Sequence, residues 1–414
     1  MQKKSNFGKF MLLWTGELIS SIGGGLTSFG LGVYIFSTTG SAANIALITL
    51  LGFLPTLLLS VPAGVLADRY DRRLLMMAGD GLSALGVLFI LICMLGGGAE
   101  LWQICVGVFI SSVFSALLEP SFKATITELL TEEEYSKASG LVSAAGSARF
   151  LFSPVIAGAL LSVTDIKLLL IIDICTFFLT VAAAAVVRKS IAVRKEKTTE
   201  SFFESMKEGW LTLKNNKGVL ILVFVASFIT LFMGMFQILA EPIILSFSDA
   251  ATLGTAETLC ASGMLVSSLI LGFKGIKGHY VKILSASLAL SGVFMAGFSL
   301  TELIVPICVF GFLFFAALPF ANNCLDCLVR TNISDELQGR AWGTIGFISQ
   351  LGYVVAYSVS GISADALGAV TGNGVGRGAA LVVLIAGICL ALIALCIPLF
   401  RSIRALEKTN KSAV

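Results

Sequence analysis

Twelve long apolar segments dominate this sequence, and each is about as long as a helix that crosses a lipid bilayer, which needs about 20 mostly apolar residues. Charged residues make up only 13% of the 414-residue chain, whereas ordinary soluble domains carry about 25%. We therefore expect an all-α, polytopic membrane protein with 12 transmembrane helices. The segments are 10–36, 43–67, 74–95, 101–125, 138–163, 168–187, 219–247, 256–273, 281–300, 303–329, 341–367 and 379–400.

The positions of the basic residues support this topology. With the N-terminus inside, 24 of the 28 Lys and Arg residues fall on the cytoplasmic side, and only Lys167 and Arg377 fall on the opposite side. Cytoplasmic loops of membrane proteins are enriched in Lys and Arg. We therefore expect a multi-pass protein with both termini in the cytoplasm.

The longest polar stretch divides the chain into two six-helix halves. The predicted parts are an N-terminal half (1–187), a cytoplasmic linker (188–218), a C-terminal half (219–400) and a cytoplasmic tail (401–414). Within the linker, apolar residues recur at helical spacing between charged ones, which predicts an amphipathic helix on the membrane surface. A loosely ordered linker is the alternative. The apolar residues are Phe202, Phe203, Met206, Trp210 and Leu213.

Several classes of function are excluded or disfavoured by residues that the chain lacks. His279 is the only histidine, which excludes multi-histidine metal sites and Ser-His or Cys-His catalysis. Cys324 and Cys327 form a C-x-x-C, but no second pair completes a metal site. The net charge of +3 is too small for a typical nucleic-acid binder. We predict no enzyme, no metal, no cofactor and no nucleic-acid partner.

A charged motif stands between the second and third segments: Gly64-Val-Leu-Ala-Asp68-Arg-Tyr-Asp71-Arg-Arg73. It resembles the loop signature G-x-x-x-D-R-x-G-R-R of the major facilitator superfamily, with Asp71 in place of the second glycine. A glycine at position 64 would allow close helix packing, and Asp68 could accept hydrogen bonds from a helix N-terminus. The resemblance implies the major facilitator fold and a latch between Asp68 and span eleven that holds the outward-facing state. The predicted gating residues are Gly64, Asp68, Arg69, Arg72, Arg73 and Asp80.

Four further blocks resemble the macrolide-efflux (Mef-type) branch of drug:proton antiporters. They are residues 51–55, 119–130, 152–154 and 208–218. The resemblance implies proton-driven export and a link to antibiotic resistance, while the substrate stays open, because the branch includes siderophore exporters. The antiporter signature of span five is degraded, since Arg149 and Ser153 replace two of its glycines. The chain has no phosphate-binding G-x-x-x-x-G-K-[ST] loop, so energy must come from a gradient or from a separate ATPase.

Three charged residues are predicted to lie inside the membrane at a similar depth. Glu17, Glu119 and Arg149 are each nine to ten residues from the expected inner end of a span, or about 14 Å at the helical rise per residue. Such residues are costly in lipid, so we expect them to form one cluster that carries the coupling proton. A structural Arg–Glu bridge is the alternative.

Three further acids lie in or near the spans. Asp80 and Asp326 are expected to join gate networks with loop arginines, and the role of Asp173 is left open between packing and function.

Family resemblance implies that spans one, four, seven and ten line a central cavity, and each of them carries polar residues on one face. A mostly apolar pocket with a few polar anchors suits amphipathic, drug-like molecules. For any single residue, a helix–helix hydrogen bond is the alternative. The candidate cavity residues are Ser21, Ser115, Gln237, Glu241, Asn322, Asn323, Asp326, Gln350, Tyr353 and Tyr357.

These observations together predict a secondary transporter of the bacterial plasma membrane. We expect a monomer that exchanges protons for amphipathic compounds of macrolide or multidrug type by alternating access, with the small-molecule substrate, protons and the lipid bilayer as its partners. Two alternatives stay open. One is a facilitator, importer or exporter of a metabolite or siderophore with the same fold, and the other is a non-transporting membrane binding subunit.

Overall fold

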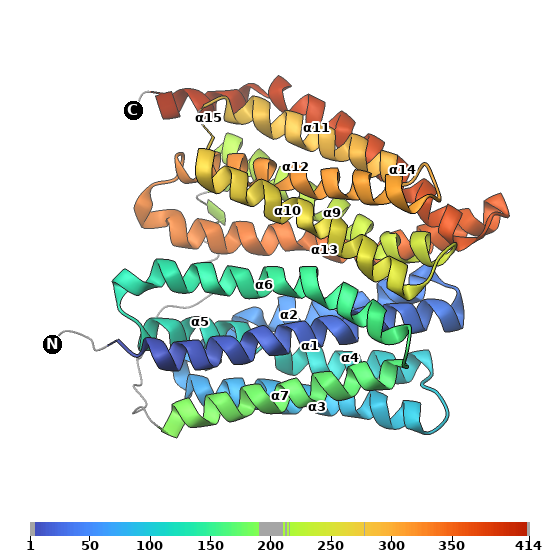
Figure 1. Cartoon of the computed structure of the whole chain (residues 1–414). Coiled ribbons are helices and arrows are strands. Elements are labelled where there is room, and N and C mark those ends of the chain that lie inside the picture. The colour runs from blue at the N-terminus through green and yellow to red at the C-terminus, as the bar shows by residue number, and fades with distance from the viewer. Residues whose placement is uncertain (1–4, 190–209, 212, 215, 277, 412–414) are drawn as a thin grey trace. The chain divides into compact units, whose positions relative to one another are not determined.

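The structure is a computed structural model that describes residues 5–189, 210–211, 213–214, 216–276 and 278–411 (Figure 1). The regular elements of this part are helices, and twelve spans within it are long and apolar enough to cross a membrane. This confirms the predicted all-α fold with 12 transmembrane helices. The helices are α1 (Phe7–Thr39), α2 (Ala42–Arg69), α3 (Arg72–Leu95), α4 (Leu101–Ser115), α5 (Leu118–Leu129), α6 (Glu132–Leu161), α7 (Ile166–Lys189), α9 (Lys217–Leu245), α10 (Ala250–Lys274), α11 (Tyr280–Phe298), α12 (Ile304–Arg330), α13 (Asp335–Thr371), α14 (Gly374–Cys396) and α15 (Arg401–Lys411).

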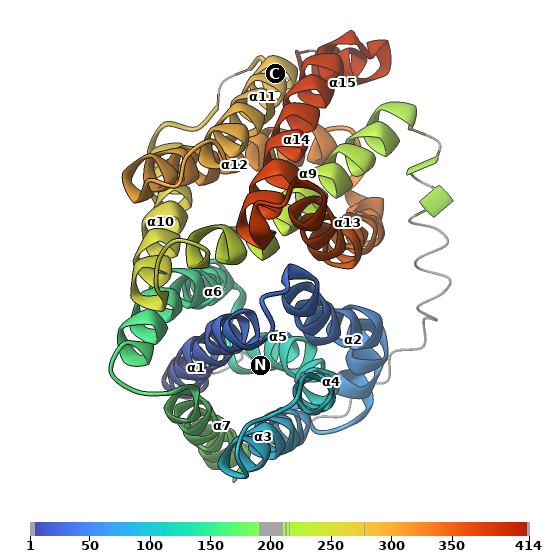
Figure 2. The same cartoon turned by 90° about the vertical axis from the view of Figure 1, so that its right-hand side faces the viewer.

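The helices form two compact units. The N-terminal unit contains α1, α3 to α7 and α2 from Leu47 onward, and the C-terminal unit contains α9 to α15 together with residues 40–46. In the N-terminal unit α7 packs on α1 and α3, while α6 packs on α1 (Figure 2). In the C-terminal unit α12 packs on α10 and α11, and α13 packs on α9 and α14. The amphipathic linker helix stays a prediction, because most of it falls on residues 190–209, outside the described part.

Span four is broken into two helices at residues 116–117, one turn before Pro120. The sequence predicts one helix here, but α4 ends at Ser115 and α5 begins at Leu118. A proline lacks the N–H that would bond to the carbonyl four residues earlier, and its ring clashes with that carbonyl. For Pro120 this carbonyl belongs to Ala116, at the break. The break separates the apolar α4 from α5, which carries Glu119 and Glu128.

Glycines bring helix backbones into contact in both units. A Cβ atom on Gly86 of α3 would collide with the carbonyl oxygen of Gly107 on α4. On α11, Gly292 stands in the same relation to the backbone of α14 at Gly387. Small residues at such crossings increase van der Waals contact, which is a main source of helix association in lipid.

The first turn of α2 is anchored to α13 by one carboxylate. Asp365 accepts hydrogen bonds from Ser41 Oγ (2.6 Å), the Ala42 amide (2.8 Å) and the Ala43 amide (3.1 Å). The amides at a helix N-terminus lack partners within the helix, and an anion there is stabilised by the helix dipole. Gly361 permits the approach, because a Cβ there would meet the backbone of Ala42. This contact explains why residues 40–46 belong to the C-terminal unit.

The predicted cytoplasmic tail contains a helix that the sequence analysis did not identify. α15 buries Ile403 and Leu406, which are three residues apart and so share one helix face. Leu406 lies against Gly218 at the start of α9. The Leu406 carbonyl also accepts a hydrogen bond from Asn332 Nδ2 at 3.3 Å. The tail helix therefore packs against the C-terminal unit through Ile403 and Leu406.

Candidate functional site

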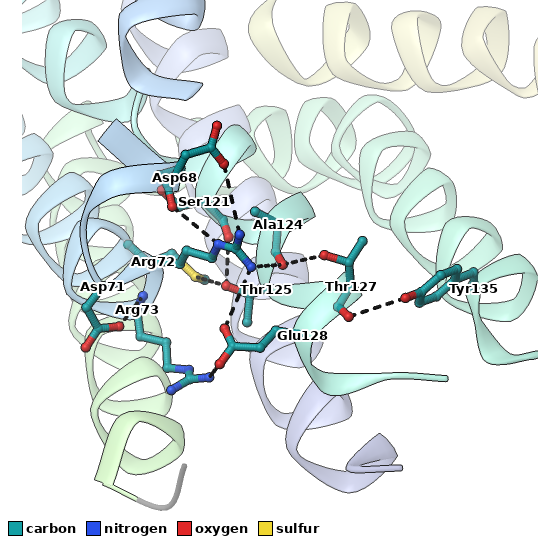
Figure 3. A network of polar contacts seen from close by, with 12 residues as sticks. Asp68, Asp71, Arg72, Arg73, Ser121, Ala124, Thr125, Thr127, Glu128 and Tyr135 are labelled. Carbon is teal, nitrogen blue, oxygen red and sulfur yellow. Dashed lines mark hydrogen bonds and ion pairs between the residues drawn. The ribbon is translucent and has the colours of Figure 1, made fainter. Parts of the chain in front are cut away.

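The loop between α2 and α3 is the centre of a polar network in the N-terminal unit (Figure 3). Asp71, which departs from the family signature, is the N-cap of α3, and its Oδ1 accepts a hydrogen bond from the Arg73 amide at 3.1 Å. Its Oδ2 accepts a second hydrogen bond from Arg188 Nε at 2.7 Å. An N-cap carboxylate satisfies amides that the helix itself leaves unpaired. Asp71 therefore begins α3 and fastens it to the end of α7.

The two arginines at the start of α3 converge on Glu128 of α5. The Arg73 side chain is only 1% exposed, and its Nη2 lies 2.5 Å from Glu128 Oε1. Arg72 Nη1 lies 3.9 Å from the other carboxylate oxygen and donates to the Ala124 carbonyl at 2.9 Å. Glu128 was not predicted as a site residue. Its signal was its place in the block of residues 119–130 that resembles the Mef-type branch.

Asp68 lies at the exposed edge of this network. Its side chain is 44% exposed, and its Oδ1 is 4.0 Å from Arg72 Nη2 (Figure 3). Arg69 is exposed. A Cβ built on Gly64 meets no atom within 4 Å, so close packing does not require a glycine there in this structure. The network thus holds Arg72 and Arg73 rigidly and leaves Asp68 and Arg69 at the surface, and the latch with span eleven stays a prediction.

Asp80 lies apart from the loop arginines. It is 2% exposed on α3, beside the Thr180 hydroxyl of α7, and it interacts electrostatically with Glu17 and Asp173. Asp80 is eight residues into α3, about 12 Å along the helix from Arg72, and its expected part in a gate network with the loop arginines stays a prediction.

The three residues of the predicted proton cluster are distributed over two places in the N-terminal unit. Glu17 on α1 interacts with Glu119 on α5. Glu119 itself is 76% exposed and accepts a hydrogen bond from Lys123 Nζ at 2.6 Å. Arg149 on α6 donates to Ser28 Oγ at 3.1 Å and interacts with Asp173. A single three-residue cluster that includes Arg149 stays a prediction.

Two predicted cavity residues of the N-terminal unit make contacts between helices. Ser21 of α1 donates to the Ala145 carbonyl of α6 at 3.4 Å. Ser115 at the end of α4 shares a hydrogen bond of 3.0 Å with Ser83 of α3. Both contacts are of the kind that hydroxyl side chains make between membrane helices.

In the C-terminal unit α9 and α13 bring two tyrosines and a glutamine together. Tyr357 donates a hydrogen bond of 3.1 Å to Gln237 Oε1. The rings of Tyr353 and Tyr357 lie 5.7 Å apart, and both rings pack against Gly234 of α9. A glycine here creates the room for two aromatic rings one turn apart. The result is a mostly buried aromatic cluster, in which Tyr357 is 5% exposed and Gln237 is the exposed polar side chain.

The remaining cavity candidates of the C-terminal unit fall into two groups. Asn322, Asn323 and Asp326 of α12 are exposed, and Asp326 interacts with Arg330 one turn later. Glu241 and Gln350 each have a buried side-chain oxygen without a hydrogen-bond partner in the described part of the chain. A buried oxygen without a donor is costly, so both oxygens are candidates for ligand or proton contacts. The single cavity predicted from both halves stays a prediction.

The described residues contain no group of three or more His, Cys, Asp or Glu side chains that could hold a metal ion. All nine cysteines are free, including Cys324 and Cys327.

Comparison with known proteins agrees with this architecture. Macrolide efflux protein A of Streptococcus pyogenes is 28% identical over 384 residues, which cover 89% of this chain and 92% of that protein. The multidrug efflux pump Tap of Mycobacterium tuberculosis is 22% identical over 382 residues, which cover 88% of this chain and 89% of that protein. These similarities confirm the resemblance to Mef-type transporters.

Solved structures show the same fold. A bacterial homologue of the iron transporter ferroportin, in an inward-facing state, covers 95% of this chain and 99% of its own at a TM-score of 0.74 and 14% identity. The nucleoside transporter NupG covers 95% of this chain and 100% of its own at a TM-score of 0.71 and 14% identity. The family model described as Major Facilitator Superfamily matches residues 13–245. The chain is a multi-pass membrane transporter, not an enzyme, and it belongs to the major facilitator superfamily.

Proposed function

We propose that this transporter exports amphipathic, drug-like compounds of macrolide or multidrug type from bacteria in exchange for protons. The observation that carries the proposal is the similarity to Macrolide efflux protein A, which extends over 89% of the chain. The protein acts as a monomer in the plasma membrane, with both termini in the cytoplasm. Alternating access moves the substrate between the two sides, and the cluster of Tyr353, Tyr357 and the exposed Gln237 provides contacts for it.

Protons are carried by acids of the N-terminal unit. Glu17 and Glu119 act on one another electrostatically, and two carboxylates that share a site favour a state in which one of them holds a proton. Glu119 also pairs with Lys123, so we assign the transported proton to Glu17. Arg149 lies on the same unit beside Ser28 and supplies the positive charge that limits the cost of the buried acids.

The loop between α2 and α3 acts as the gate. Arg72 and Arg73 are held by Glu128, so the loop is rigid, and Asp68 at its edge is placed to accept hydrogen bonds from another helix. In the outward-facing state this partner is the N-terminus of span eleven. Asp68→Asn would weaken that contact, because a neutral amide gains less from a helix dipole than a carboxylate does.

The test is macrolide transport by vesicles with an imposed pH gradient. Wild-type protein is expected to drive labelled macrolide against its concentration gradient, whereas Glu17→Gln and Glu119→Gln lose the gradient-driven part. Asp165→Asn, at an exposed acid next to Lys167, is the matched control and keeps full transport. Full coupled transport by both glutamine variants would contradict the assigned role of the acids. Uptake of a metabolite instead of macrolide export would favour the importer alternative.

A further inference from the structure

A polar stripe on α7 lies in the interior of the N-terminal unit. Asp173, Thr176 and Thr180 are spaced three and four residues apart, so they share one face of the helix. Their exposed fractions are 1%, 6% and 5%. In a membrane helix a buried stripe of this kind is costly unless it has partners or a function.

The stripe is covered by α1, whose glycines let the two helices approach closely. A Cβ on Gly23 would lie 2.5 Å from Thr176 Oγ1 and 3.0 Å from Asp173 Oδ1. A Cβ on Gly16, two turns earlier, would lie 3.4 Å from the Thr180 methyl group. No α1 side chain therefore separates its backbone from the stripe at these two levels.

Charged groups reach the stripe from each helix packed around α7. α3 contributes Asp80, which is 2% exposed and lies beside Thr180. α6 contributes Arg149, which interacts with Asp173, and α1 contributes Glu17, which interacts with Asp80. Three acids thus face one cation. If all four were ionised, the interior would hold a surplus of negative charge, which a low-dielectric environment strongly disfavours.

The hydrogen bonds of the two threonine hydroxyls indicate whether the neighbouring carboxyl groups carry protons. Thr180 Oγ1 donates to the Phe177 carbonyl at 2.8 Å, and Thr176 Oγ1 donates to the Asp173 carbonyl at 2.7 Å. A hydroxyl has only one proton to donate, so while each threonine donates to its own helix carbonyl, it can only accept from a neighbouring carboxyl. Oδ1 of Asp80 and Oδ1 of Asp173 form no hydrogen bond in the described part of the chain, and neither does the buried Thr27 hydroxyl of α1, which interacts with Asp173 and could either donate to it or accept from it. Both acids therefore fit the site as neutral carboxyl groups that donate to the threonines.

We propose that Asp80 and Asp173 form a buried proton-binding pair, connected through Thr176 and Thr180 along the interior of the N-terminal unit. The two levels are about 10 Å apart, from the seven residues between Asp173 and Thr180 and the helical rise, and Thr176 lies between them. The pair extends the proton site from Glu17, next to Asp80, to Arg149, next to Asp173. Its role in coupling rests on the proposed proton-driven export, whereas the binding of protons does not.

Infrared spectroscopy of the purified protein tests the proposal without transport. A protonated carboxyl has a C=O stretch that is separate from the bands of a carboxylate and shifts in D₂O. At neutral pH the wild type is expected to show this band, Asp80→Asn and Asp173→Asn each to weaken it, and the double variant to weaken it further. Asp165→Asn is the control and leaves the band unchanged. An unchanged band in both single variants would overturn the proposal.

Thr180→Val provides a second measurement that does not remove a carboxyl group. Valine has the same shape but cannot accept a hydrogen bond, so the part of the band that belongs to Asp80 is expected to move to higher frequency. An unmoved band would contradict the proposed donation from Asp80 to Thr180.

Vesicle transport separates this proposal from the proposed function. A wild type that shows the band but no gradient-driven macrolide export would contradict proton coupling while leaving the proton-binding pair intact.

Discussion

The two units bury different kinds of side chain. Arg73, Asp80 and Asp173 are each at most 2% exposed, and all three belong to the N-terminal unit. Among the described residues of the C-terminal unit, the polar residues that are buried as a whole are serines and a threonine. That unit is built around aromatic packing instead, since Phe236 stacks on Phe314 with ring centroids 4.5 Å apart.

This difference indicates which buried side chains serve function rather than the stability of the fold. Among the described residues of the C-terminal unit, Glu241 and Glu407 have a buried carboxylate oxygen without a hydrogen-bond partner, but none of its charged side chains is as buried as Arg73, Asp80 or Asp173, so packing of the helices does not by itself require charges that deep. Intramembrane charges that packing does not require point to gating or proton movement. The loops differ in the same way, because residues 272–279 at the corresponding place in the C-terminal half contain no acid.

The largest effect is expected from Arg73→Leu. The substitution leaves Glu128 without its closest cation, and breaking a buried ion pair in this way costs about 3 kcal/mol or more. Arg330→Leu in the C-terminal unit is the control, because Arg330 lies over the Trp342 ring at 5.3 Å and such an exposed contact is worth less than about 1 kcal/mol. Thermal unfolding in detergent measures both. Equal losses would contradict the contrast between the units.

A smaller loss is expected from Asp365→Ala, which removes the carboxylate that caps α2. Removal of an N-cap side chain costs about 1 kcal/mol, and here the amides of Ala42 and Ala43 lose their acceptor. Glu302→Ala, at an exposed acid of the same unit, is expected to leave the unfolding temperature unchanged. If Asp365→Ala were as damaging as Arg73→Leu, the C-terminal unit would also depend on a critical charge.

The smallest effect is expected from Lys123→Gln. The Lys123–Glu119 pair is 62% and 76% exposed, and exposed ion pairs contribute at most about 1 kcal/mol. The unfolding temperature should therefore change little. A loss comparable to that of Arg73→Leu would place Glu119 among the buried charges of the N-terminal unit.

The sequence predicted the helices well, because a membrane span depends on local information. Apolar length defines a span, and the signature around Asp68 and Arg72 is contiguous. The partners of these residues were harder to predict. Glu17, Glu119 and Arg149 have similar depths, but depth does not determine the direction in which a side chain points around its helix. For Glu119 that direction is also changed by the break before Pro120, which the hydropathy pattern does not show.

Three contacts could not have been predicted from spacing alone. Glu128 contacts Arg73 only because α5 packs on α3. Asp80 lies beside Thr180 only because α7 also packs on α3. Asp365 binds the Ala42 amide across more than 300 residues of sequence. Each depends on which helices are neighbours and on how closely glycines let them approach. Composition and periodicity carry no information about either.

The most direct test of proton-coupled export is to follow the substrate and protons together. Wild-type protein in vesicles with an acidic lumen is given labelled macrolide outside, and a pH-sensitive dye reports the lumen. We predict that macrolide accumulates in the lumen while the lumenal pH rises, and that collapse of the gradient by a proton ionophore before macrolide is added abolishes both the accumulation and the macrolide-dependent rise in pH. Accumulation without a substrate-dependent change in pH, or transport that the ionophore does not affect, would contradict the account.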